Sequence, residues 1–153
     1  MIDKNIEAFI LKQSPTFVKK AEDVAVLHTE HNVAHAKLLL SQYKYARVPV
    51  LNQEKEFVGV IGLNEIVDFE MKADFYYEKS QKTSIGEITN HNISTVQQSY
   101  SLEEVMHILV KEPFIPVLQG KTFKGIIVRQ EILKAFNAFA HDFTKQYEIT
   151  QRN

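Results

Sequence analysis

The stretch Val48-Pro49-Val50-Leu51, followed by Phe57-Val58-Gly59-Val60-Ile61-Gly62-Leu63 and Asn64-Glu65-Ile66-Val67, decides the fold of this chain. It predicts a strand, a short turn, a second strand and a helix. The pattern returns about 67 residues later as Ile115-Pro116-Val117-Leu118, Phe123-Lys124-Gly125-Ile126-Ile127-Val128 and Arg129-Gln130-Glu131-Ile132-Leu133. Pro49 thus corresponds to Pro116, and Gly59 to Gly125. An internal repeat of this length governs the interpretation of the whole chain.

The repeat extends upstream in both copies. The compact apolar run 24–27 predicts a buried strand, and Asn32 can cap a helix that runs from Val33 to about Tyr43. In the second copy, residues 93–96 predict the strand and Ser101 caps the helix. The order β-α-β-β-α therefore occurs twice. Because a copy of roughly 50 residues is too small to bury its own sheet face, we expect an α+β fold with two pseudo-twofold-related units packed as one globule.

The remaining segments complete the expected domain organisation. Residues 1–13 form an amphipathic N-terminal helix, and the first unit spans 14–72, starting with Ser14 as a helix cap and Pro15 in the first helical position. Residues 73–83 connect the units, and their aromatic side chains are expected to pack on a core. The second unit spans 84–140, and the tail 141–153 extends the last helix or frays.

Composition excludes several classes of function. The 153-residue chain is 44% hydrophobic and 24% charged, which is typical of a globular protein with a buried core. Its net charge of -1 provides no long-range attraction for nucleic acid or an anionic membrane, and the absence of cysteine excludes disulfides and thiol nucleophiles. Apolar runs such as 58–63 are too short to span a membrane. Since residues 1–5 lack a signal-peptide pattern, we expect a cytoplasmic protein.

Catalytic motifs are missing. The sequence has no Gly-rich phosphate loop, no Gly-x-Ser-x-Gly elbow and no paired metal motif. Glu65 and Glu131 are equivalent in the two copies, so the repeat places them in separate clefts and not as an acid–base pair. We therefore expect a protein that is not an enzyme and needs no cofactor.

Three histidines, His28, His31 and His35, allow two interpretations. His31 and His35 share a helical face and could bind a metal. No cysteine is present and no nearby carboxylate has convincing ligand spacing, which favours a solvated, histidine-rich helix start. We expect no metal site here.

A β-α-β-β-α unit with an apolar-Pro-Val strand, a glycine in the next strand and a polar helix start resembles the CBS domain, and two in tandem resemble a Bateman module. The resemblance covers residues 14–140. The size of the chain and the stretches 23–25, 45–51 and 59–64 are similar to stand-alone CBS-pair regulators of Gram-positive bacteria that bind cyclic di-AMP. This resemblance implies an adenine nucleotide ligand, a homodimer and a regulated partner protein.

The resemblance also implies two clefts, each combining the first strand of one copy with the second strand and second helix start of the other. The first would hold Asp23, Val24 and Ala25 with Phe114, Ile115, Arg129, Gln130 and Glu131, with Lys20 as a possible second cation. The second would hold Ile93 and Ser94 with Ala46, Arg47, Asn64 and Glu65. Strand backbone can bond the base edge, and a helix start with an adjacent arginine attracts phosphate.

Departures from the family pattern leave two hypotheses. Adenosine-binding CBS domains often carry Ser or Thr followed three residues later by Asp, where this chain has Gly62 with Glu65 and Val128 with Glu131. Gln130 and Asp23 stand where similar proteins favour basic residues. The leading hypothesis is a regulatory module that binds cyclic di-AMP, with AMP or ATP second. The alternative is an interaction or scaffold protein whose nucleotide site has decayed.

Overall fold

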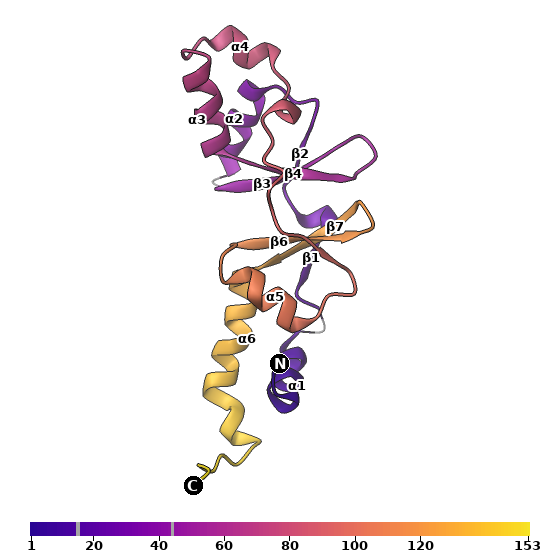
Figure 1. Ribbon diagram of the computed structural model, residues 1–153, viewed down its shortest axis with the longest axis vertical. Helices are drawn as coiled ribbons and strands as arrows, with labels where there is room; N and C mark the ends of the chain where they lie inside the picture. Colours follow the sequence, from indigo (N-terminus) through magenta and orange to yellow (C-terminus); the bar gives the residue numbers. More distant parts are fainter. Residues whose placement is uncertain (15, 44) are drawn as a thin grey trace.

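The computed structural model describes residues 1–14, 16–43 and 45–153 of an elongated molecule (Figure 1). Two sheets face each other at the centre, and helices cover their outer faces toward both ends of the long axis. The helices are α1 (Lys4–Gln13), α2 (Val33–Tyr43), α3 (Leu63–Lys72), α4 (Tyr77–Lys82), α5 (Leu102–Leu109) and α6 (Arg129–Asp142), with short 3-10 helices η1 (Ala21–Asp23), η2 (Ile85–Glu87) and η3 (Phe143–Lys145). The strands are β1 (Val18–Lys20), β2 (Leu27–His28), β3 (Arg47–Leu51), β4 (Phe57–Gly62), β5 (Val96–Gln97), β6 (Phe114–Gln119) and β7 (Thr122–Val128).

The predicted repeat is confirmed by the order of elements and by strand register. β2, α2, β3, β4 and α3 form one copy, and β5, α5, β6, β7 and α6 form the other. Each copy has a parallel pair followed by an antiparallel hairpin, and each hairpin shifts register at the same place, after Val50 and after Val117. Equivalent sequence therefore makes equivalent structure, and the fold is the expected α+β pair of units.

The two copies exchange short extended segments, which the sequence did not indicate. β1 lies in the first unit, ahead of its repeated elements β2 to α3, but pairs antiparallel with β7 of the second, giving sheet orders β1-β7-β6-β5 and β2-β3-β4. Reciprocally, Asn90 lies in the second unit ahead of β5 and bonds to β4 of the first: Val60 N donates to Asn90 O at 2.9 Å, and Asn90 N donates to Val60 O at 2.8 Å. Each sheet is thus extended by a short segment that belongs to the other unit.

The equivalent glycines Gly59 and Gly125 make this exchange possible. A Cβ at Gly125 would overlap the carbonyl oxygen of Lys19 on β1, and a Cβ at Gly59 would overlap the carbonyl oxygen of Asn90. Gly125 also has φ 149°, a value that residues with a side chain rarely adopt. The repeated glycine therefore marks the crossing point of a segment from the other copy.

The tips of the two β-hairpins form hydrogen bonds with each other across the centre of the molecule. Phe57 N donates to Lys121 O and Phe123 N donates to Lys55 O, each at 3.0 Å, and the rings of Phe57 and Phe123 stack at 6.3 Å. Leu51, Leu118 and Phe123 form a buried cluster here, distinct from the two cores between each sheet and its helices. Burial of apolar surface at this seam joins the copies into one body.

The helix starts expected at Asn32 and Ser101 are confirmed. Asn32 Oδ1 accepts from His35 N at 2.8 Å, and Ser101 Oγ accepts from Glu104 N at 3.2 Å. The helix start expected at Ser14 is wrong: Ser14 is the extended C-cap of α1, and the chain forms strand β1 from Val18; Pro15 itself lies outside the described residues. α6 ends near the expected position, and the chain continues into η3. Of the helices that the structure describes, none has the length and apolar character needed to cross a membrane.

The first strand of each copy is shorter than predicted. Only Leu27 of the run 24–27 joins β2, and only Val96 of the run 93–96 joins β5. The register that pairs Leu27 with Val50 would place Val26 beside Pro49. Val60, opposite Pro49, turns its N–H and C=O toward Asn90, so the nitrogen of Pro49 faces β2, where proline has no N–H to donate. The parallel ladder therefore begins one residue later.

The connector differs from the prediction in both structure and burial. It contains α4, and its aromatic residues Phe75, Tyr76 and Tyr77 are exposed rather than packed on a core. Asp74 and Phe75 have φ of 52° and 57°, and Phe75 N donates to Glu70 O at 2.8 Å, closing the end of α3 with a left-handed turn. That turn points the chain, and with it the aromatic side chains, away from the core.

Gly125→Ala should lower the free energy of unfolding by about 2–4 kcal/mol, because the new methyl group overlaps β1 and the backbone is strained. Gly120→Ala is the matched control, since Gly120 also has positive φ but nothing lies within 4 Å of an added Cβ; its cost should be about 1 kcal/mol. Urea unfolding followed by circular dichroism measures both. Equal losses would show that the crossing at Gly125 contributes nothing beyond backbone strain.

Candidate functional site

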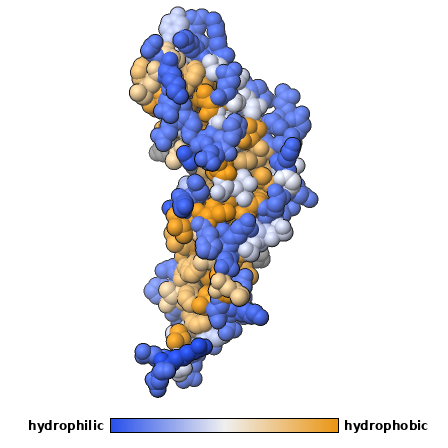
Figure 2. All heavy atoms as spheres, in the orientation of Figure 1, coloured by the Kyte–Doolittle hydropathy of each residue, from blue (hydrophilic) through white to orange (hydrophobic). Residues whose placement is uncertain are grey.

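A cleft of about 570 Å³ lies between the two copies. Its size falls within the range of roughly 300–1,000 Å³ typical of small-molecule sites. Apolar residues gather at the waist of the molecule, where the two sheets meet (Figure 2). The lining comes from three parts of the fold: Thr16, Phe17, Val18, Lys19, Val24 and Ala25 before the first copy's strand, Tyr45, Arg47, Val48 and Pro49 around β3, and Phe114, Ile126, Val128, Gln130 and Glu131 from the second copy.

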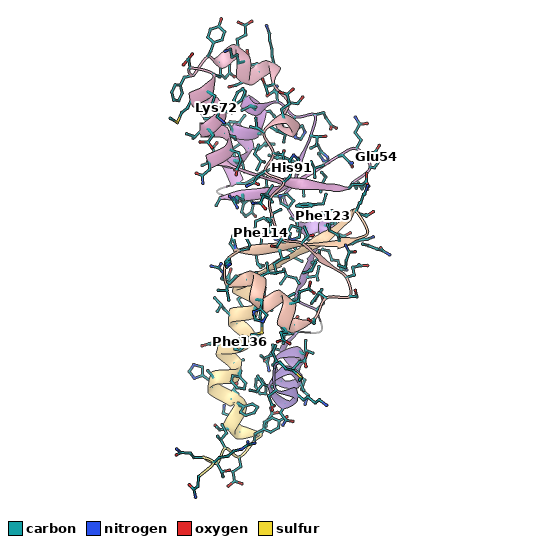
Figure 3. All side chains as sticks on the ribbon, in the orientation of Figure 1. Glu54, Lys72, His91, Phe114, Phe123 and Phe136 are labelled. Carbon is teal, nitrogen blue, oxygen red and sulfur yellow. The ribbon has the colours of Figure 1, made fainter. Side chains whose placement is uncertain are left out.

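The walls of the cleft are largely apolar. Val24 and Ala25 precede β2 and lie outside its ladder, and Val24 N donates to Ala21 O at 3.2 Å. Phe114 begins β6 and is buried, and Figure 3 shows it at the level where the two sheets meet. A flat aromatic ligand could therefore bond its edge to backbone and pack its face against these side chains.

The charges of the cleft are Lys19, Arg47 and Glu131. Glu131 accepts a hydrogen bond from Lys134 Nζ at 2.8 Å on its own helix. Arg47 Nη2 lies 3.6 Å from Glu65 Oε1, and the Arg47 side chain is 31% exposed. A distance of 3.6 Å is too long for a hydrogen bond, so Arg47 has guanidinium donors available to an anion in the cleft.

Glu65 is held in place from two directions. Its Oε2 accepts from the backbone N of Gly62 at 2.8 Å, which is the glutamate half of a capping box at the start of α3, since Gly62 has no side chain for the other half. Its Oε1 accepts from Asn90 Nδ2 at 3.4 Å. Because Asn90 is itself bonded to β4 through its backbone, this carboxylate is anchored to the exchange of segments between the copies.

Arg129 lies away from the cleft. Its Nε donates to Leu109 O at 2.7 Å, and the residue lines a separate groove of about 300 Å³ between α5 and α6. The other residues of this groove are apolar: Met106, Leu109, Val110, Ile132, Leu133 and Phe136. A phosphate in the cleft would therefore meet Arg47 and Lys19 instead of the expected Arg129.

The structure brings six of the expected residues into one cleft, namely Val24, Ala25, Arg47, Phe114, Gln130 and Glu131. The others are not among its lining: Ile115 is fully buried in the core of the second copy, whereas Lys20, Asp23, Ala46 and Ser94 are exposed. Arg47 was expected in the second cleft and lies in the first. The sequence missed Lys19 and Tyr45 because β1 is too short to give a periodic signal, and the position of Tyr45 depends on how the chain approaches β3.

Several residues expected in the second cleft make close contacts with one another. A Cβ at Gly62 would overlap the carbonyl oxygen of Ala46 and lie 2.9 Å from Arg47 Cγ. A side chain at residue 62 would therefore require the chain before β3 to move away from the start of α3. Arg47, Glu65 and Asn90 form the polar contacts at this position.

The three histidines make edge-on ring contacts, with centroids 5.5 Å apart for His28 and His31 and 4.9 Å apart for His31 and His35. His31 Nδ1 accepts from His28 N at 3.2 Å. Within the described residues, no group of three or more His, Cys, Asp or Glu side chains has a metal-binding arrangement. Burial, followed by the neighbouring charges of His35 and His28, lowers the pKa of His31.

Comparison with known proteins agrees with this architecture. A family model described as "CBS domain" matches residues 18–72 and 85–138. The chain is similar to the crystal structure of CbpB from Streptococcus agalactiae, with 38% sequence identity and a TM-score of 0.91 over 99% of this chain and 96% of that chain. It is also similar to CbpB in complex with c-di-AMP, with 37% identity and a TM-score of 0.84 over 94% of this chain and 97% of that chain.

A curated relative has a consistent name. The chain is 24% identical to Cyclic di-AMP receptor B of Bacillus subtilis (strain 168) over 131 residues. This alignment covers 84% of this chain and 89% of the relative.

The contribution of His31 to the free energy of unfolding should decrease as the pH falls below about 6.5, the ordinary histidine pKa, and level off below the lower folded-state pKa of His31. Over this window the unfolded chain binds a proton that the folded His31 resists. Above it both states are neutral at His31 and the full stability is present. Urea unfolding at a series of pH values should show a shallower decrease for His31→Gln. Parallel profiles for the two proteins would contradict the assignment to His31.

Proposed function

This chain belongs to the CBS domain family, and on that premise we propose that it is a non-catalytic, cytoplasmic sensor that binds cyclic di-AMP in the cleft between its two CBS units and thereby controls a partner protein. We propose that the nucleotide is a regulatory ligand and that the protein needs no cofactor. We propose the units at 14–72 and 84–140, with an N-terminal helix at 1–13, a connector at 73–83 and a tail at 141–153.

The observation that carries this proposal is the combination of groups in one cleft. The backbone of Val24 and Ala25, which lies outside the β2 ladder, can bond the edge of an adenine, and Phe114 with the apolar wall can enclose its face. Arg47 and Lys19 provide positive charge for phosphate. The c-di-AMP complex of the similar CbpB structure supports this choice of ligand over AMP or ATP.

The second candidate is a CBS-pair scaffold that binds AMP or ATP weakly or has lost its nucleotide site. One observation favours it: Arg47 already faces a carboxylate, and the neutral Gln130 stands at the cleft where a basic residue was expected. The two candidates differ in whether a nucleotide shifts the stability of the folded chain, because only a ligand that binds the native state raises the unfolding temperature.

A homodimer would use the exposed apolar residues on the outer helices. Leu63, Val67 and Met71 lie four residues apart on α3 and are exposed, so they form a stripe along one face. Leu133 on α6 and Val110 at the end of α5 are exposed on the second copy. We propose that these surfaces form an isologous contact and that ligand binding changes the affinity of the module for its regulated partner.

Cyclic di-AMP should raise the unfolding temperature and bind in isothermal titration calorimetry. Arg47→Met should weaken binding by about 10–100-fold, because a charge-assisted hydrogen bond to phosphate contributes about 1.5–3 kcal/mol. Arg129→Met is the matched control and should bind normally, since its side chain lies in the other groove. AMP and ATP are tested alongside. No thermal shift with any of these nucleotides would favour the scaffold.

Val67→Asp should reduce self-association of the protein, measured by sedimentation equilibrium, because it places a charge in the middle of the apolar stripe on α3. Leu11→Asp is the control: Leu11 is also an exposed apolar residue, but it lies on α1. A dimer that survives Val67→Asp with unchanged affinity would rule out the α3 stripe as its interface.

A further inference from the structure

Arg47 is positioned between two acceptors. It lines the cleft, and its Nη2 lies 3.6 Å from the carboxylate of Glu65. The pair has no hydrogen bond of good length, so its attraction is mainly Coulombic and the guanidinium remains able to turn toward another anion. An anion that binds Arg47 in the cleft must therefore compete with Glu65.

Glu65 is a fixed competitor and does not follow Arg47 into the cleft. The bond from Gly62 N holds one carboxylate oxygen, and Asn90 holds the other. Its side chain is 14% exposed, so water screens the ion pair less than it screens a surface pair. The stem of Arg47 passes close to Gly62, where an added Cβ would lie 2.9 Å from Arg47 Cγ.

The second copy lacks this arrangement. The position equivalent to Arg47 holds Phe114, and Glu131, the equivalent of Glu65, is bonded to Lys134 on its own helix. The pairing of Arg47 with Glu65 is thus a property of one copy and not a general requirement for starting the helix after the hairpin. Because the Arg47–Glu65 pair lies beside the cleft, it affects the positive charge available to a bound ligand.

We infer that Glu65 is an internal competitor for Arg47 that lowers the affinity of the cleft for anionic ligands and so sets the concentration at which the sensor responds. This inference rests on the proposed function and adds a residue that tunes it. Glu65 is a positioning residue in this scheme: it acts on the ligand through Arg47 and makes no contact of its own with phosphate.

The test measures cyclic di-AMP binding by calorimetry for wild type, Glu65→Gln, Arg47→Met and the double variant. Glutamine keeps an oxygen that can accept from Gly62 N but removes the negative charge. Glu65→Gln should tighten binding by about 3–10-fold, as expected for loss of a partly screened charge near the cation. Glu70→Gln is the matched control: Glu70 is on the same helix, 15% exposed and paired with Lys37 at 2.6 Å, and its loss should leave binding unchanged.

The double variant separates a specific effect from a general one. If Glu65 acts through Arg47, Glu65→Gln should give no gain when Arg47 is already methionine. An equal gain in both backgrounds, or a gain of the same size from Glu70→Gln, overturns the inference. Unfolding measurements on each variant show whether any change in affinity merely follows a loss of stability.

The outcomes also distinguish this inference from the proposed function. If wild type binds cyclic di-AMP and Glu65→Gln binds no more tightly, the inference fails and the sensor remains. If wild type shows no binding but Glu65→Gln binds, the inference is supported and the native chain is not a sensor for that ligand. If neither binds, both are overturned.

Discussion

The exchange of short extended segments between the two copies is the constraint on which the rest of the structure depends. β1 completes the sheet of the second copy, and Asn90 bonds to the sheet of the first. Both crossings require backbone to approach backbone more closely than a Cβ allows, which is why Gly59 and Gly125 occur at equivalent positions. The clasped hairpin tips add a second set of bonds between the copies, so neither unit is complete without the other.

The ligand cleft is a direct consequence of that exchange. β1 brings Val18 and Lys19 to the second copy's sheet. Pro49 has no N–H to donate, so β3 does not pair with the residue just before β2. The backbone of Val24 and Ala25 thus lies outside the β2 ladder and beside the cleft. The same exchange places Asn90 next to Glu65, and Glu65 next to Arg47. The charge of the cleft is thus linked to the contacts that hold the two copies together.

Sequence reasoning succeeded where the signal was local or repeated. Asn32 and Ser101 cap helices because their side chains reach backbone only three residues away. The hairpins were evident from apolar runs around polar turns. The first strands were predicted too long, because the missing hydrogen bonds arise from a proline on another strand. The exposed aromatic residues after α3 were placed in a core because their composition suits burial, whereas a left-handed turn at Asp74 and Phe75 directs them outward.

By itself the sequence determined the doubled β-α-β-β-α unit, the helix caps and the family, because periodicity, capping and spacing are properties of neighbouring residues. It also indicated that a cleft should lie between the copies, and several of its residues. Only the tertiary structure decided which arginine faces that cleft. Arg47 begins β3 and Arg129 begins α6, both near the seam between the copies. Leu109 O accepts a hydrogen bond from Arg129, whereas the carboxylate of Glu65 attracts Arg47. The direction of each side chain depends on partners that are distant in the sequence, so a local sequence pattern does not predict it.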